Sequence, residues 1–175
     1  MAEIIVGDSD SVHVAYWGTA SYFGGYGMML SRQSPASEDC IIDTIRARVG
    51  TSTGAKAGMF SNRAEEYYTC NDVVNLGNIT GLYVTVSGLA LEGKAGEFIA
   101  IYATNRWYTN TGGQTLRIYS GDATNGSEYT FSSFIDKDAC IYGTGETVAA
   151  GGGALVGGSA LVGGQILCGN SPLIN

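Results

Sequence analysis

The sequence predicts an all-β protein, an antiparallel β-sandwich or jelly roll, and three observations support this class. No window of about eleven residues places apolar residues at the three- and four-residue spacing of an amphipathic helix. Two-residue alternation recurs along the chain instead, as expected for half-buried strands. The alternating runs follow one another at intervals of roughly 10 to 15 residues and are separated by glycine-, threonine- and asparagine-rich turn sequences, which is typical of sandwiches and jelly rolls.

The alternation is clearest in residues 45–49. Ile45, Ala47 and Val49 are apolar, whereas Arg46 and Arg48 between them are cationic, so one face is expected to be buried and the other to carry both arginines. Residues 97–103 (EFIAIYA) are apolar on both faces after the first residue, which indicates a central strand. The expected strands cover residues 12–17, 22–30, 40–49, 55–60, 66–69, 81–87, 97–104, 114–120, 128–134 and 138–143.

Length, composition and charge exclude several classes. The 175 residues suffice for one domain with a sizeable core. Charged residues make up 14% of the chain and hydrophobic residues 45%, so it is not a highly charged disordered tail. The formal net charge is −7 and the nine Lys and Arg residues are spread along the chain, so we expect neither nucleic acid nor a membrane surface as a partner.

Three segments are expected: residues 1–11 as an N-terminal arm, 12–146 as the sandwich, and 147–175 as a glycine-rich apolar tail. The N-terminus lacks a basic start followed by an apolar run, so we expect no secretory signal and folding in a cytoplasm. No uninterrupted apolar stretch reaches the length of a transmembrane helix.

The tail contains three consecutive six-residue units, GGALVG, GSALVG and GQILCG. Glycine contributes no side-chain area and loses much entropy on ordering, so a monomer buries the apolar residues of this segment poorly. We expect association with sister chains through Leu155, Val156, Leu161, Val162, Ile166 and Leu167. The alternatives are a flexible linker and a hexapeptide β-helix that forms only when chains associate.

Neither a metal nor a cofactor is expected. Cys40, Cys70, Cys140 and Cys168 match no zinc or disulfide spacing, so free and mostly buried thiols are predicted, with Cys40 and Cys140 as neighbours if their strands are the first and last of one sheet. The run from Asp8 to Asp10 offers oxygen ligands but lacks the glycine and distal glutamate of an EF-hand, so a solvated acidic loop is expected there.

The sequence also favours a protein that is not an enzyme. The single histidine, His13, argues against a serine hydrolase, which needs a histidine base beside a positioned serine. A glycosidase needs two carboxylates in one cleft, and Glu65, Glu66, Glu92 and Glu97 supply candidates only in the sense that any all-β protein with many acidic residues does.

Aromatic residues form the most suggestive candidate site. Tyr67 and Tyr68 follow two glutamates, and Arg106, Trp107 and Tyr108 lie in a polar stretch expected to be a loop. Aromatic rings beside amides stack on sugars, and Trp, Tyr and Arg anchor protein interfaces. The alternative is that these rings cap the ends of the core.

The region from about Val12 to Tyr142 resembles a known module. IIDTIRARVGTSTGAKAGMFSN and LYVTVSGLALEGKAGEFIAIYATN are similar to the jelly-roll sandwich of bacteriophage structural proteins and bacterial surface-anchored proteins. In that family a strand of the type ITKIRVYVG precedes a GLYSD strand and a V.L..G..YWIAI strand pair. Residues 45–50, 58–62 and 89–102 take these places here.

The resemblance implies a non-enzymatic virion protein, either a capsid decoration (cement) protein or a head or tail fibre, assembled in the host cytoplasm. It further implies a homotrimer, with the major capsid protein or other virion proteins as partners, and it carries over no catalytic residue. The alternative is a carbohydrate-binding module or receptor-binding tip, in which Tyr67, Tyr68, Trp107 and Tyr108 form a stacking platform for a host surface glycan.

Overall fold

The computed structural model describes residues 2–9, 21–23, 27–81, 83–105, 107–111, 115–133, 137–148, 160–162 and 165–167. Their regular elements are β1 (Glu3–Gly7), β2 (Ser21–Phe23), β3 (Gly27–Ser31), β4 (Cys40–Arg48), β5 (Ser52–Ala64), β6 (Tyr67–Ile79), β7 (Tyr83–Gly93), β8 (Phe98–Ala103), β9 (Trp107–Thr111), β10 (Leu116–Tyr119), β11 (Glu128–Thr130), β12 (Ser132–Ser133), β13 (Lys137–Ala139), β14 (Ile141–Thr147), β15 (Ala160–Val162) and β16 (Gln165–Leu167). All pair antiparallel where a partner is given. The predicted all-β class is therefore confirmed.

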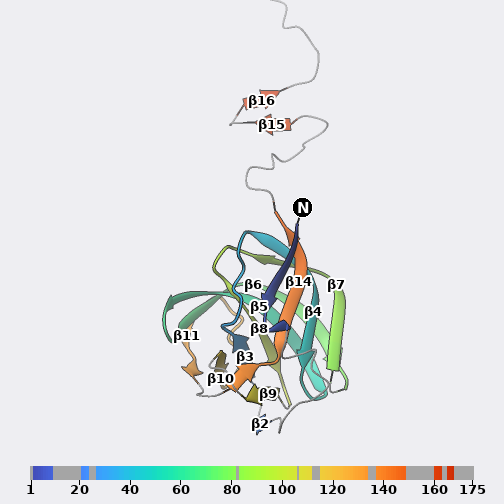
Figure 1. Ribbon diagram of the computed structural model, residues 1–175, viewed down its shortest axis with the longest axis vertical. Helices are drawn as coiled ribbons and strands as arrows, with labels where there is room; N and C mark the ends of the chain where they lie inside the picture. Colours follow the sequence, from blue (N-terminus) through green and yellow to red (C-terminus); the bar gives the residue numbers. More distant parts are fainter. Residues whose placement is uncertain are drawn as a thin grey trace, which may run out of the picture.

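Two sheets pack face to face (Figure 1). The first sheet has the order β1-β14-β4-β7, and the second has the order β11-β6-β5-β8-β3-β10-β12. Their facing sides contribute to one cluster of buried residues, which includes Val6, Ile42 and Ile45 from the first sheet and Met59 and Ile99 from the second. Burial of these side chains supplies the main driving force for the sandwich.

The strand pairing is nested. β1 pairs with β14, β3 with β8, β4 with β7, and β5 with β6. Among these eight strands the first therefore pairs with the eighth, the second with the seventh, the third with the sixth and the fourth with the fifth. Strands β9 to β13 come between β8 and β14 in the chain.

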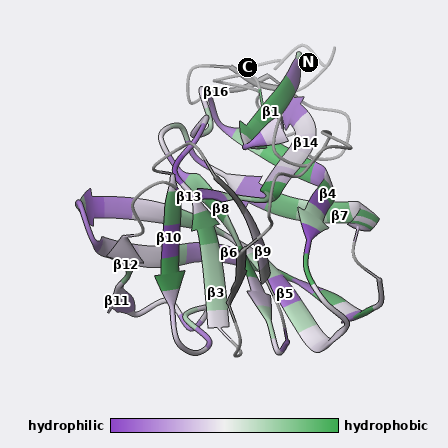
Figure 2. Ribbon diagram, turned by 60° about the horizontal axis from the view of Figure 1, so that its bottom comes forward, coloured by the Kyte–Doolittle hydropathy of each residue, from purple (hydrophilic) through white to green (hydrophobic). Residues whose placement is uncertain are grey.

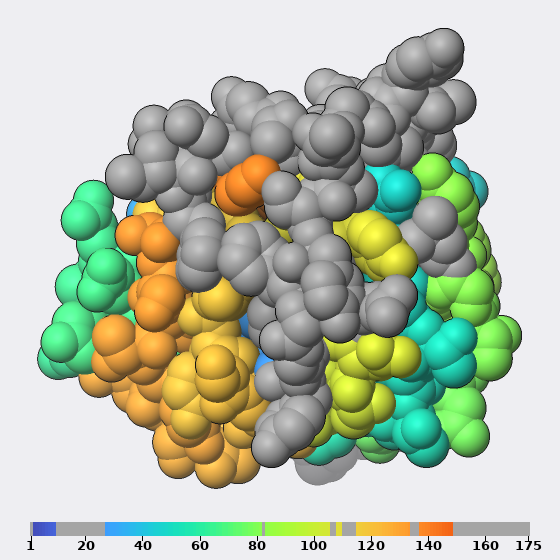
Figure 3. Space-filling view, turned by 90° about the horizontal axis from the view of Figure 1, so that it is seen from below, coloured from blue at the N-terminus to red at the C-terminus, as the bar shows by residue number. Residues whose placement is uncertain are grey.

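A second core covers the other face of the second sheet. Phe131 lies fully buried against Phe60 and Tyr68, with ring centroids 5.8 and 5.2 Å away. Figure 3 shows the segment from about residue 115 to 133, in yellow to orange, along the side of the molecule opposite β4 and β7. Apolar residues on β3 and β10 are visible in Figure 2. The middle of the second sheet is therefore buried on both faces, and β8 lies there between β5 and β3, which confirms the prediction that residues 97–103 form a central strand.

The alternation predicted for residues 45–49 is also confirmed. Ile45, Ala47 and Val49 are buried in the core between the sheets. Arg46 and Arg48 lie on the outer face of β4, where they are opposite Tyr142 and Tyr83, respectively.

Other strand predictions need correction. Residues 3–7, assigned to an N-terminal arm, form β1, because Ile4 and Val6 insert into the core while Glu3 and Ile5 face outward; the apolar Ile5 on the outer face hides the alternation in the sequence. Residues 107–111, expected as a loop, form β9 between β2 and β13. The strands expected at 55–60 and 66–69 extend into the long hairpin β5–β6. The strand expected at 12–17, together with His13, lies outside the described residues.

Cys40, Cys70 and Cys140 are free and buried, as predicted, and Cys168 lies outside the described residues. The predicted proximity of Cys40 and Cys140 is wrong. Cys40 pairs with Thr147 at one end of the β4–β14 ladder, whereas the carbonyl of Cys140 accepts a hydrogen bond from the Arg48 amide at the other end. Because these two strands run antiparallel, cysteines that start each of them lie at opposite ends.

We expect burial to slow the reaction of these thiols with alkylating reagents, and Cys70 gives the clearest test. Desolvation raises the pKa of Cys70 to about 12, so the folded state keeps a proton that the unfolded chain loses near the ordinary thiol value. The contribution of this group to the free energy of unfolding therefore falls as pH rises from about 9 towards 12. We expect iodoacetamide at pH 9 to modify Cys70 rapidly in denaturant and slowly in the folded protein, as followed by peptide mass spectrometry. Equal rates would contradict this burial.

The C-terminal strands β15 and β16 pair with each other, and the sheets of the described chain join neither of them to a strand of the sandwich. Figure 1 shows the pair apart from the sandwich. Leu161 is opposite Ile166, and Val162 is opposite Gln165. Within the described residues, no helix has the length and apolar character needed to cross a membrane.

Candidate functional site

The structure separates the aromatic residues proposed as a platform. Tyr68 is fully buried, its hydroxyl donates to the Glu65 carbonyl at 3.3 Å, and burial raises its pKa above the ordinary range. Tyr67 is 41% exposed, and its ring faces the Arg63 guanidinium at 5.2 Å. Neighbours in a strand point to opposite faces, so Tyr68 belongs to the core and only Tyr67 is available to a ligand.

The second aromatic pair lies elsewhere. Trp107 and Tyr108 belong to β9 of the three-stranded sheet β13-β9-β2, whereas Tyr67 and Tyr68 begin β6 of the second sheet. Figure 3 places the β5–β6 turn at one edge of the molecule and β9 towards the other side. Arg106 lies outside the described residues. The structure therefore does not join all of these residues in one platform.

Tyr108 contributes to a different cluster. The Arg48 guanidinium carbon lies 5.0 Å from the centre of the Tyr108 ring and 5.4 Å from that of Tyr83. Arg46 donates to the Tyr142 hydroxyl at 2.9 Å. We call Arg46, Arg48, Tyr83, Tyr108 and Tyr142 the arginine–tyrosine cluster. Cations over aromatic faces are stabilising contacts, and Arg and Tyr are common anchors of protein interfaces.

The arginines of this cluster follow from the sequence pattern, but the tyrosines do not. The alternation in residues 45–49 places Arg46 and Arg48 on one face, as predicted. Tyr83 and Tyr142 join them only through the register of β7 and β14 on β4. No local signal marks that register, because the partners are about 35 and 96 residues away in the chain.

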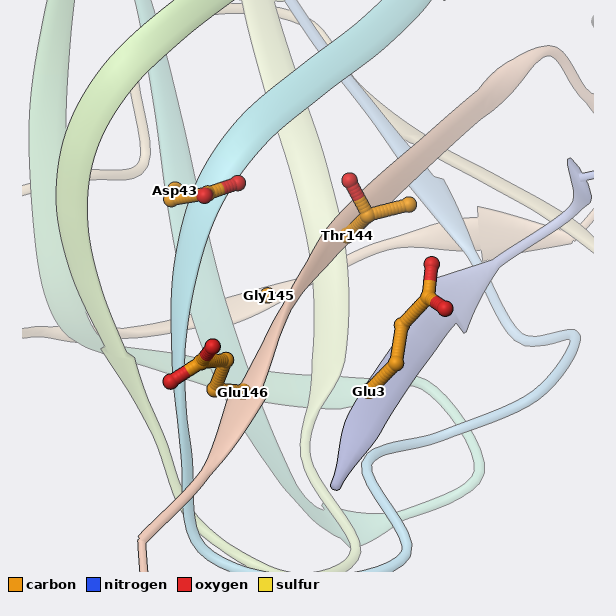
Figure 4. Close-up of a pocket in the computed structure, with 5 residues that line it drawn as sticks. All are labelled: Glu3, Asp43, Thr144, Gly145 and Glu146. Atoms are coloured by element: carbon orange, nitrogen blue, oxygen red, sulfur yellow. The ribbon is translucent and has the colours of Figure 1, made fainter. Parts of the chain in front are cut away.

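Acidic residues surround a hollow at the other end of the same sheet (Figure 4). The hollow is lined by Glu3, Asp43, Thr144, Gly145 and Glu146 and has a volume of about 400 Å³. Asp43 occupies a β-bulge, because Thr144 is opposite Thr44 whereas Gly145 is opposite Ile42. Bulges bend a strand and redirect a side chain.

The bulge requires glycine on the facing strand. A Cβ at Gly145 would lie 1.9 Å from the Ile41 carbonyl oxygen. Only a residue without a side chain permits this approach of β14 to β4. Sequence reasoning gave no role to Gly145, and its G-T-G context carries no signal of a bulge.

The carboxylates considered for glycosidase chemistry do not share a cleft. Glu97 is buried, accepts a short hydrogen bond from Asn71 and a 2.8 Å bond from the Lys94 amide, and so holds the β7–β8 turn. Glu92 is exposed at the end of β7, and Glu65 and Glu66 are exposed at the β5–β6 turn. Glu97 therefore has a structural role in the β7–β8 turn, and the other three carboxylates are too scattered to act with it.

The acidic run near the N-terminus was also considered as a source of metal ligands. Asp8, expected in a solvated loop, is buried, and its amide donates to the Ile141 carbonyl at 2.9 Å; the expectation was wrong because β1 carries Asp8 to the edge of the core. In the part of the chain that is described, no three His, Cys, Asp or Glu side chains are grouped to hold a metal ion.

Of the tail residues, Leu161, Val162, Ile166 and Leu167 lie in β15 and β16, whereas Leu155 and Val156 lie outside the described residues. Comparison with known proteins yields no match to a family model, a curated protein or a solved structure.

Proposed function

We propose that the chain is a non-enzymatic structural subunit of a virion, a capsid decoration protein or a head or tail fibre, which associates with sister copies through residues 147–175. The nested pairing of β1, β3–β8 and β14 supports interpreting the sandwich as a jelly roll, and this agrees with the resemblance to bacteriophage structural modules. The proposed partners are the major capsid protein or other virion proteins, and a homotrimer is the proposed assembly.

The carrying observation is the separate pair β15–β16. Its three-residue strands contain mostly apolar residues and pair with no strand of the sandwich among the described sheets. A two-stranded hairpin alone is marginally stable in water at best. Packing against the same segment of neighbouring copies supplies the missing burial, whereas the sandwich already has its own closed core.

Removing the tail is expected to lower the oligomeric state. We would measure the mass in solution of the full chain, of a chain ending at Ala150, and of a full-length Leu161→Ser/Ile166→Ser variant. The full chain should be oligomeric and the other two smaller, with thermal unfolding of the sandwich retained. A full chain whose mass is unaffected by both changes would reassign the tail to a passive linker.

A second candidate function is glycan binding, and the exposure of Tyr83 beside Arg48 and Tyr108 favours it. The exposed Tyr83 ring offers a stacking face to a sugar, while Arg48 beside it is 8% exposed and contacts the rings of Tyr83 and Tyr108. Tyr83→Ala and Tyr108→Ala would then abolish saturable binding on a glycan array, whereas Tyr67→Ala would not. Absence of saturable binding by the wild type would leave only the structural role.

A further inference from the structure

The outer face of the first sheet carries exposed side chains along its length. Strand register places Glu3 and Ile5 of β1, Thr144 and Glu146 of β14, Ile41, Asp43, Thr44 and Arg46 of β4, and Tyr83, Thr85, Ser87 and Glu92 of β7 on this face. A 3.2 Å hydrogen bond between the hydroxyls of Thr44 and Ser87 marks the middle of the face. The second sheet differs, because its outer face packs on the second core.

Exposed apolar side chains are concentrated here. Ile5, Ile41 and Tyr83 are 45%, 40% and 54% exposed, and Val148, directly after β14, is 43% exposed. Among the residues whose side-chain burial is described, the other large hydrophobic ones with comparable exposure are Tyr67 and Val73. The exposed apolar residues of this face are spread over it among polar side chains: Ile5 is opposite Thr144, Ile41 lies between Glu146 and Glu92, and Tyr83 is opposite Arg48.

Negative charge gathers at one end of the face. Glu3 is directly opposite Glu146, Glu146 is opposite Ile41, and Ile41 is opposite Glu92. The ion pairs between described residues are Lys56–Asp122, Arg63–Glu128 and Lys94–Asp39, so none involves this row or Asp43. Like charges opposite each other destabilise a sheet, and a cation placed over the row would relieve the repulsion.

Positive charge lies at the other end. Arg46 is opposite Tyr142, four residues along β14 from Glu146, which corresponds to roughly 14 Å at the usual rise of a strand. The Arg46 side chain is partly exposed, and it takes part in none of the ion pairs between described residues. The Thr44–Thr144 level separates the two charged rows.

We propose that this face binds the same face of a second copy of the chain, with the two copies related by a two-fold axis that crosses the strands at the Thr44–Thr144 level. The rotation brings Arg46 of each copy over the Glu3, Glu146 and Glu92 row of the other, and Ile5 over Ile5. Facing sheets lie about 10 Å apart, a gap that arginine and glutamate side chains bridge together. The contact is isologous, so each charge pair occurs twice.

This contact does not use residues 149–175 and is therefore separate from the tail association of the proposed function. Its chemistry is charge complementarity on either side of the hydroxyl-bearing Thr44–Thr144 level, which mainly determines orientation and specificity. Because the charges lie at the surface, association through this face weakens with salt, as the Debye length shrinks from about 10 Å at 0.1 M to about 3 Å at 1 M.

Charge reversal in the full chain tests the proposal. Arg46→Glu alone and Glu146→Lys alone each place like charges in both halves of the contact, whereas a mixture of the two variants restores an opposite pair in each half. We expect sedimentation analysis to show each single variant at least about tenfold weaker in this association, and the equimolar mixture close to wild type. Glu66→Lys, at the exposed β5–β6 turn, is the control with the same charge change as Glu146→Lys and should behave as wild type.

Because Arg46 donates to the Tyr142 hydroxyl, the Arg46→Glu variant must also show unchanged thermal unfolding. A second pair of variants, Asp43→Lys mixed with Arg46→Gln, avoids reversing the charge at Arg46. Asp43→Lys alone is expected to associate more weakly than the wild type. If the mass in solution changes in the tail variants but in none of these charge variants, the face contact is overturned while the proposed function is retained. Weakening by the single variants without recovery in the mixture would also overturn it.

Discussion

Replacing Phe131 with alanine is expected to lower the free energy of unfolding by about 3–5 kcal/mol. Phe131 is fully buried, and its ring lies at an edge against Phe60 and Tyr68 and 5.7 Å from Tyr119. Its amide also donates to the Glu66 carbonyl at 2.7 Å, so this residue joins the segment after β10 to the second sheet. The decrease in the free energy of unfolding has two sources: the apolar surface that is no longer buried and the cavity that the missing ring leaves.

Urea titration followed by tryptophan fluorescence measures this effect. Tyr67→Ala, on the exposed side of the neighbouring strand, is the aromatic control and should cost no more than about 1 kcal/mol. A Phe131→Ala protein as stable as the wild type would show that the second core contributes nothing to the fold.

Gly145→Ala is expected to destabilise the protein by about 3 kcal/mol, the upper end of the usual cost of overpacking, because the added methyl group would overlap the Ile41 carbonyl and push β14 away from β4. Gly54→Ala separates this effect from backbone strain. Gly54 has φ of +63° and no atom within 4 Å of an added Cβ, so its substitution should cost only about 1–2 kcal/mol.

Thermal or chemical unfolding of both variants checks the comparison. Equal losses at the two positions would mean that the approach of β14 to β4 at the Asp43 bulge is relaxed at little cost, and that the acidic hollow does not depend on this glycine.

The fold was predictable where the pattern is local and long enough. Ile45 to Val49 alternate over five residues, and residues 97–103 are apolar on both faces, so burial and central position followed directly. β1 shows the limit: its outward Ile5 breaks the apolar–polar alternation, and its place beside β14 depends on a contact with the far end of the chain.

The candidate site was less predictable because it depends on register. Tyr67 and Tyr68 looked alike in sequence, yet strand geometry places one in solvent and the other in the core. Tyr83 and Tyr142 reach the two arginines only because β7 and β14 flank β4, and Glu3 meets Glu146 across nearly the whole chain. Such pairings come from the global packing of apolar residues, which no short motif records.

The central claim is that the sandwich holds its own core whereas the C-terminal strands depend on other copies. Amide hydrogen exchange of the full chain at high and low protein concentration tests it most directly. We predict that β5 and β8 remain protected at both concentrations, and that protection of residues 160–167 appears only at the concentration where chains associate. Concentration-independent protection of residues 160–167 in a monomer, or rapid exchange in β8, would contradict the claim.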